Sequence, residues 1–230
     1  MTWLACGKCR SVLLAMAISG VLGSAAPVSA QTGNASAASA AKAAPAAKAA
    51  PAATPGSAAV PEAGTYKIDL AHSHAYFVIS HLGISRFMGR FDDIQGDYVV
   101  GERPEAGSVK ASIRVDSINT KHQKMEEHLR SPDFFDAVRF PTMDFVSTKV
   151  SWNRRGEGKL SGNLTIHGVT RPIDFSLKVV GAGLGNRGET RSGFEATTTI
   201  KRSDFGMNYG LPRVVGDVVE ITLSVEGIKQ

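Results

Sequence analysis

Three of the six histidines lie between residues 72 and 81, and they are the side chains in this chain best suited to chemistry. His72, His74 and His81 could ligate a metal ion, and Ser73 could act as a nucleophile beside His72. The segment alternates apolar and polar residues as a β-strand does, and residues seven apart face opposite sides of a strand. His74 and His81 therefore cannot share a metal ion, and we expect no metal site here.

Ser73 lacks the surroundings of a catalytic nucleophile. Its histidine is its direct neighbour in sequence, no carboxylate is placed to orient that histidine, and no nucleophile elbow surrounds the serine. The chain also shows no paired carboxylates with workable spacing. We therefore predict no catalytic residues and no enzyme activity, with an enzyme acting on a lipid kept as an alternative.

The alternation assigns the two faces of this strand. Ala75, Phe77, Ile79 and His81 share one face. We expect that face to form the inner wall of a barrel. His81 then has two interpretations, a core histidine hydrogen-bonded to a neighbour or a contact with the polar part of a ligand.

The first thirty residues predict a secretory signal peptide, which we place at 1–30. Lys8 and Arg10 precede an apolar stretch, and Val28-Ser29-Ala30 has the small residues of a cleavage site. The apolar stretch is shorter than the roughly 20 residues that a transmembrane helix needs. Because both cysteines precede it, we expect the exported protein to contain no disulfide.

Residues 31–63 are almost entirely Ala, Pro, Ser, Thr and Gly, and they predict a disordered linker with nothing to bury. Four of the 26 basic residues and one of the 21 acidic residues precede Ala63, leaving 22 against 20 in the rest. This balance, without a basic stripe interleaved with aromatic residues, predicts no nucleic-acid partner. Residues 64–230 remain as one domain.

The domain is a succession of alternating segments separated by turn residues. About eight strands emerge, which is the pattern of an antiparallel barrel or sandwich. Because the apolar face of each strand must avoid water, we predict an all-β barrel whose interior is filled or holds one small ligand. The alternating segments lie at 66–69, 74–81, 87–100, 108–115, 143–148, 160–166, 173–179, 194–200 and 219–225.

One segment departs from the strand pattern. Ile118, His122, Met125 and Leu129 recur at the spacing of one helical face, and Pro132 should end that helix. Two adjacent phenylalanines follow at 134 and 135. They either line the mouth of the barrel or fasten the short helix to its core.

Several stretches together resemble the YceI-like family of lipid-binding proteins, whose fold is lipocalin-like. They occur in the family's order and span nearly the whole domain. They are Ile68-Asp69 through Phe91, His128 to Phe135, Phe140 to Phe145, Gly162 to Pro172, and Arg202 to Met207.

The resemblance implies an extended antiparallel barrel of about eight strands with one short helix. Its apolar cavity would hold a polyisoprenoid, an isoprenoid quinone or a fatty-acid derivative, with no cofactor besides that lipid. It also implies a periplasmic carrier or scavenger. A ligand-free stress-response or interaction module is the other alternative, and peripheral membrane contact and oligomeric state, dimers included, stay open.

The same resemblance and the strand faces select the site residues. His72, Arg86, Arg130, Arg171 and Arg202 are the candidates for binding a polar head group, because guanidinium groups pair bidentately with phosphate. The expected lining of the cavity is Phe77, Ile79, His81, Phe87, Phe91, Phe134, Phe135, Met143, Phe145, Leu164, Ile166, Phe175, Phe194, Phe205 and Ile221.

Overall fold

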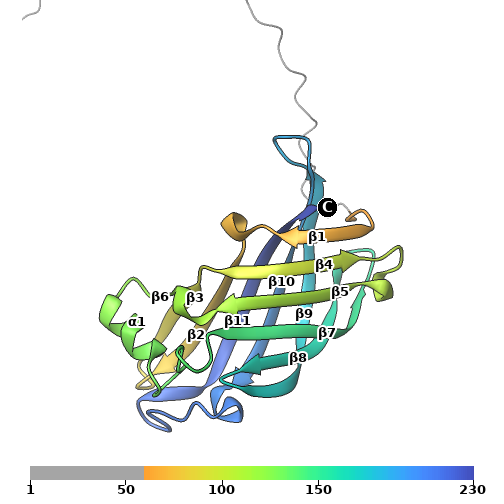
Figure 1. Ribbon diagram of the computed structural model, residues 1–230. Coiled ribbons are helices and arrows are strands. Elements are labelled where there is room, and N and C mark those ends of the chain that lie inside the picture. The colour runs from red at the N-terminus through yellow and green to blue at the C-terminus, as the bar shows by residue number, and fades with distance from the viewer. Residues whose placement is uncertain (1–59) are drawn as a thin grey trace, which may run out of the picture. The chain divides into compact units, whose positions relative to one another are not determined.

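Alternating apolar and polar residues form a meander of antiparallel strands, which a computed structural model describes over residues 60–230 (Figure 1). The predicted signal peptide, and the predicted linker up to residue 59, lie outside the described residues. The strands are β1 (Gly64–Ile68), β2 (His74–His81), β3 (Ser85–Phe91), β4 (Ile94–Val100), β5 (Ser108–Arg114), β6 (Ile118–Asn119), β7 (Thr142–Trp152), β8 (Glu157–Ile166), β9 (Val169–Leu184), β10 (Thr190–Lys201) and β11 (Val215–Lys229).

These eleven strands make an eight-stranded closed barrel, because three of its strands are interrupted. β1 and β2 both pair with β11, and they pair on their other side with β4 and β3 respectively. β5 and β6 continue the next interrupted strand against β4 and β3. The ring closes where β1 pairs with β11. The predicted all-β antiparallel barrel is therefore confirmed.

The up-and-down order places alternate connections at opposite ends of the barrel. We call one end the mouth end. It carries the β2–β3 turn, the segment between β6 and β7 with helix α1 (Gln123–Arg130), the β8–β9 turn and the β10–β11 loop. The far end carries the β4–β5, β7–β8 and β9–β10 connections. Short 3-10 turns interrupt or link strands at η1 (Leu70–His72), η2 (Pro104–Ala106), η3 (Val115–Ser117) and η4 (Arg202–Phe205).

Helix α1 is shorter than the sequence predicts. It begins at Gln123, where His122 is the N-cap and its Nδ1 accepts a hydrogen bond from Met125 N–H at 3.2 Å. Ile118, which shares the predicted helical face, instead lies in β6 and is buried. The helix ends at Arg130, before Ser131-Pro132 as predicted.

Ser73 has a structural role at the break between β1 and β2. It is fully buried, its Oγ accepts a hydrogen bond from Glu226 N–H at 3.0 Å, and it donates to the Glu226 carbonyl at 3.2 Å. The hydroxyl thus replaces the ladder hydrogen bonds that the chain loses where it leaves the strand for η1.

An ion-pair cluster fixes the outside of the same break. Arg191 Nη1 contacts Asp69 Oδ2 at 2.8 Å and Glu226 Oε1 at 2.5 Å, and its Nε contacts Glu189 at 2.7 Å. His72 Nδ1 lies 2.8 Å from the same Asp69 oxygen. Ligand atoms of Asp69, His72 and Glu226 come within 4.8 Å of one another, and the Arg191 guanidinium pairs with both carboxylates. The arrangement is a salt-bridge network around a strand break.

We expect Asp69→Asn to destabilise the protein above about pH 4. Hydrogen bonds with His72, Arg191 and the Ala71 N–H lower the pKa of Asp69 from 3.8 to about 2. A lowered carboxyl pKa adds stability above the unfolded value, and that stability is lost as the pH falls towards the folded value. The loss at pH 7 should be about 1–2 kcal/mol in the free energy of unfolding. Urea unfolding monitored by Trp152 fluorescence measures it.

The pH profile separates ionic from merely local effects of that substitution. The difference between the Asp69→Asn variant and the native protein should shrink between about pH 4 and pH 2. Asp97→Asn, on the exposed face of β4, is the control and should change stability by less than about 0.5 kcal/mol. A difference that stays constant down to pH 2 would show that the carboxylate charge is irrelevant.

Two stacked tyrosines close the far end of the barrel. The rings of Tyr66 and Tyr98 are parallel with centroids 5.1 Å apart. The Tyr98 hydroxyl donates to the Ser192 carbonyl at 2.8 Å, and burial raises the pKa of Tyr98 to about 12. Gly227 permits this packing because a Cβ there would lie 2.5 Å from the Tyr98 ring. With Ile68, Ile94 and Val225 these tyrosines form a separate buried cluster that seals the barrel.

Candidate functional site

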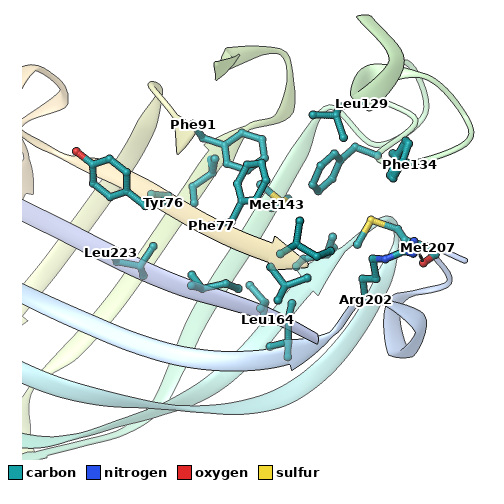
Figure 2. Close-up of a pocket in the computed structure, with 18 of the residues that line it drawn as sticks. Tyr76, Phe77, Phe91, Leu129, Phe134, Met143, Leu164, Arg202, Met207 and Leu223 are labelled. Carbon is teal, nitrogen blue, oxygen red and sulfur yellow. Dashed lines mark hydrogen bonds between the residues drawn. The ribbon is translucent and has the colours of Figure 1, made fainter. Parts of the chain in front are cut away.

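An apolar cavity of about 460 Å³ occupies the barrel between this seal and the mouth end (Figure 2). Its volume lies within the range of roughly 300–1,000 Å³ that is typical of small-molecule sites. Residues from nearly every strand line it, because each strand contributes its inward-facing alternate positions. The strand residues at its wall that the site prediction leaves out include Ile68, Ala75, Ile94, Val109, Ala111, Ile113, Leu160, Ile200, Val219, Leu223 and Val225.

Aromatic side chains form one wall of the cavity. Phe77 lies with its ring centroid 6.3 Å from Phe87 and 5.8 Å from Phe91, and Phe91 meets Phe135 edge to face at 5.5 Å. Gly89 on the neighbouring strand makes room for Phe77, because a Cβ there would collide with the ring. Phe77 remains only partly buried, since its free surface faces the cavity.

Three segments surround the mouth. The β2–β3 hairpin contributes His81, Ser85 and Arg86, helix α1 contributes Met125 and His128, and the β10–β11 loop contributes its own set of lining residues. Figure 2 shows Leu129 and Phe134 at the same end of the cavity as Arg202 and Met207. The loop residues on the lining are Met207, Tyr209 and Val214, and Val215 follows them at the start of β11.

An aromatic contact links helix α1 to the β10–β11 loop. The His128 ring meets Phe134 and Tyr209 edge to face, each with centroids 5.1 Å apart. His128 Nε2 also lies 2.9 Å from Asp133 Oδ2. These contacts hold helix α1 and the segment after it against the β10–β11 loop.

Arg202 is the one cationic side chain that is both buried and on the cavity lining in the described residues. It is 3% exposed, and its guanidinium donates to four backbone carbonyls, two in the β10–β11 loop and two at the start of β11. Burial lowers the pKa of Arg202, while the charge of Asp217 opposes that shift. Because the usual arginine pKa is above 12, the side chain stays charged. The four acceptors are Gly216 at 2.8 Å, Met207 at 2.7 Å, Tyr209 at 2.8 Å and Val215 at 3.0 Å.

The polar side chains on the cavity lining are therefore concentrated at one end of the barrel. Apart from Tyr76, which lies at the opposite side of the view in Figure 2, every polar or charged side chain on the lining belongs to the mouth end. These side chains are His81, Ser85, Arg86, His128, Arg202 and Tyr209. Such a site is shaped for a molecule with a long apolar part and a polar end at the mouth.

Fourteen of the fifteen residues expected on the lining are found there, and Phe205 is not. Phe205 lies in η4, where the chain has left β10, so the alternation of the strand no longer sets its direction. It is buried in the core instead, and its carbonyl lies 3.3 Å from His167 Nδ1. Contact of the fourteen residues with a ligand remains a proposal.

Three of the five head-group candidates lie away from the cavity. His72 is on the outside of the strand break, bonded to Asp69. Arg130 Nη1 donates to the Asp116 carbonyl, and Arg171 Nε donates to the Asp204 carbonyl, both at 3.2 Å. Arg86 and Arg202 are on the lining, with Arg86 also paired to Glu220. Sequence spacing could not separate these arginines because each follows or precedes a turn.

Several positions on the cavity lining carried no periodic signal in the sequence. Met207, Tyr209 and Val214 lie in an irregular loop whose path is set by Arg202, so neither strand nor helix spacing could assign them. His128 is on helix α1, and its direction depends on how the helix is docked. Val219 and Leu223 could have been found, because they share the inward face of β11 with Ile221.

A comparison with known protein families identifies the family of this barrel. A family model described as the YceI-like domain matches residues 66–227, nearly the entire barrel. This chain belongs to the YceI-like family. The family suggested by the sequence motifs is thereby confirmed, and the YceI-like domain coincides with the part of the chain that forms the closed barrel.

Related proteins agree with this membership. The UPF0312 protein of Pseudomonas aeruginosa strain LESB58 is 42% identical over 171 residues, covering 73% of this chain and 88% of the relative. A crystal structure of the Campylobacter jejuni YCEI protein has 30% identity and a TM-score of 0.58, covering 66% of this chain and 90% of that one.

A more distant structure shares the fold. It is a polyisoprenoid binding domain from Saccharophagus degradans, 18% identical with a TM-score of 0.57, and the match covers 72% of this chain and 98% of that one. Within residues 60–230 of the present chain, no helix has the length and apolar character needed to cross a membrane.

Proposed function

We propose that this YceI-like protein binds one long-chain amphiphile in its barrel, with the apolar chain inside and the polar end at the mouth. The observation that carries the proposal is the cavity of about 460 Å³, whose lining is apolar except for Tyr76 and the polar side chains at the mouth end. Burial of apolar surface contributes roughly 25 cal/mol per Å², so the apolar chain should supply most of the affinity.

The ligand class we favour is a polyisoprenoid, an isoprenoid quinone or a fatty-acid derivative. The S. degradans structure of the same fold is described as a polyisoprenoid binding domain, which supports an isoprenoid. Arg202, His81 and Ser85 are the groups we assign to the polar end. His81 makes no side-chain hydrogen bond to any of the residues that the structure describes, which favours its role as a ligand contact over a satisfied core histidine.

We further propose that the protein acts as a carrier or scavenger in the periplasm. The sequence of residues 1–30 supports export, and a cavity open at one end supports reversible loading better than permanent storage. The lipid would be the ligand itself, with no cofactor required.

Organic extraction of the purified protein followed by mass spectrometry tests the proposal. We expect about one isoprenoid or acyl lipid per protein molecule, recovered intact. Recovery of a chemically altered lipid after incubation with an added one would favour the enzyme alternative. A protein that yields no lipid and also fails to take up an added quinone, polyprenyl phosphate or fatty acid would overturn the proposal.

A further inference from the structure

An exposed aliphatic surface lies beside the mouth. The β2–β3 turn presents Leu82, 51% exposed, and Ile84, 85% exposed, and the β10–β11 loop presents Val214, 44% exposed. Leu82 N–H donates to the Val214 carbonyl at 2.9 Å, which joins the two loops side by side. We call these three residues the mouth tip.

Local turn chemistry does not account for these side chains. Leu82 and Gly83 have φ values of 54° and 67°, in the left-handed region that Gly, Asn and Asp adopt far more readily than residues with an aliphatic side chain. Core packing does not account for them either, because Leu82 and Ile84 face solvent. A large aliphatic residue placed in a disfavoured conformation, without a share in the core, points to contact with something outside the protein.

The mouth tip is part of the rim of the cavity. His81 and Ser85 flank the turn on both sides and line the cavity, and Val214 itself lies on the lining. A lipid leaving or entering the barrel between the hairpin and the β10–β11 loop therefore passes these side chains. An apolar rim inserted among lipids would spare the apolar chain of the ligand from crossing water.

A basic side chain lies directly beside the mouth tip. Arg213, adjacent to Val214, is exposed and forms no ion pair with any residue in the described range. Arg86 is also exposed, although it pairs with Glu220. An unpaired basic side chain such as Arg213 beside an apolar tip suits the surface of a bilayer containing anionic phospholipids, which attracts basic residues.

We propose that the mouth tip docks this protein on an anionic phospholipid bilayer, so that the barrel exchanges its lipid directly with the membrane. This inference rests on the proposed function, since it assigns the rim of that same site. The partner is the lipid surface rather than a second protein, because the tip joins aliphatic groups to an unpaired arginine at the opening of a lipid cavity.

Vesicle co-sedimentation tests the proposal, with all variants made in the full chain so that residues 1–59 contribute equally. The native protein should bind vesicles of phosphatidylglycerol and phosphatidylethanolamine more tightly than vesicles of phosphatidylcholine. Leu82→Asn with Ile84→Ser should weaken partitioning at least about tenfold, because two exposed aliphatic side chains no longer insert. Asn suits the left-handed backbone at residue 82, so this variant should fold at least as well.

Two further variants test whether the position of the aliphatic residues and the charge of Arg213 matter for vesicle binding. Leu184, 78% exposed on the β9–β10 hairpin, lies at the far end of the barrel, and Leu184→Ser should leave partitioning unchanged. Arg213→Gln should reduce the preference for anionic vesicles while keeping weak binding to both compositions. Equal losses from the Leu184 variant and the tip variant would overturn the proposal.

The outcomes also separate this inference from the proposed function. If the tip variant still yields lipid on extraction but no longer binds vesicles, both proposals stand. If the native protein contains lipid but does not bind vesicles, only the docking proposal fails. If the protein contains and takes up no lipid, the proposed function fails regardless of vesicle binding. A change of oligomeric state in the tip variant, measured by sedimentation velocity, would identify a second copy as the occupant and overturn the membrane assignment.

Discussion

Replacing Arg202 by Met should lower the free energy of unfolding by about 3–5 kcal/mol, the largest loss we expect from a single substitution outside the seal. The guanidinium donates to four backbone carbonyls between residues 207 and 216, and all four would lose a buried donor. Unsatisfied buried polar groups cost about 1–3 kcal/mol each, partly relieved when the loop relaxes. Chemical denaturation monitored by Trp152 fluorescence measures the change.

Two variants test the reason for that loss. Arg202→Lys keeps the charge but presents its donors from a single nitrogen, which cannot reach carbonyls spread around a planar guanidinium. It should therefore recover only a minor part of the stability. Arg171→Met is the control, because Arg171 is exposed and makes one long hydrogen bond to the Asp204 carbonyl. If the Arg171 and Arg202 variants lose stability equally, the carbonyl network is not the cause.

The second large effect is expected from Ile221→Asp, which should reduce the bound lipid to less than about a tenth of the native amount. Ile221 faces the cavity between Phe77 on β2 and Thr198 on β10. A carboxylate there must either stay charged beside an apolar chain or take up a proton, and both alternatives cost several kcal/mol. About 1.4 kcal/mol already corresponds to a tenfold change in affinity. The ratio of extracted lipid to protein is the measurement.

The neighbouring position supplies a matched control. Thr222 follows Ile221 on β11 but faces solvent, so Thr222→Asp should keep full lipid content and change stability by less than about 0.5 kcal/mol. Ile221→Trp adds volume without charge and should also exclude lipid, at a stability cost of about 1–3 kcal/mol. Full lipid content in a folded Ile221→Trp protein would place the ligand elsewhere.

The strand faces were predictable because their physical basis is local. In β2, alternation alone placed Phe77, Ile79 and His81 on one side, since successive side chains of any strand point in opposite directions. The same reasoning failed at Phe205, which follows the end of β10, and at Ile118, which extends a helical pattern across the end of β6. Periodicity holds only inside an element, and the boundaries of elements depend on hydrogen bonds made elsewhere.

The sequence by itself determined an all-β barrel, its family, and the residues facing inward from each regular strand, because burial of apolar side chains requires the period of two. The tertiary structure decided every feature that depends on how the barrel closes. It showed that β1 and β2 share one interrupted strand bridged by Ser73, that two tyrosines seal the far end, and that Arg202 rather than Arg130 or Arg171 reaches the cavity. These features join residues far apart in the chain, and no local pattern records how distant segments meet in space.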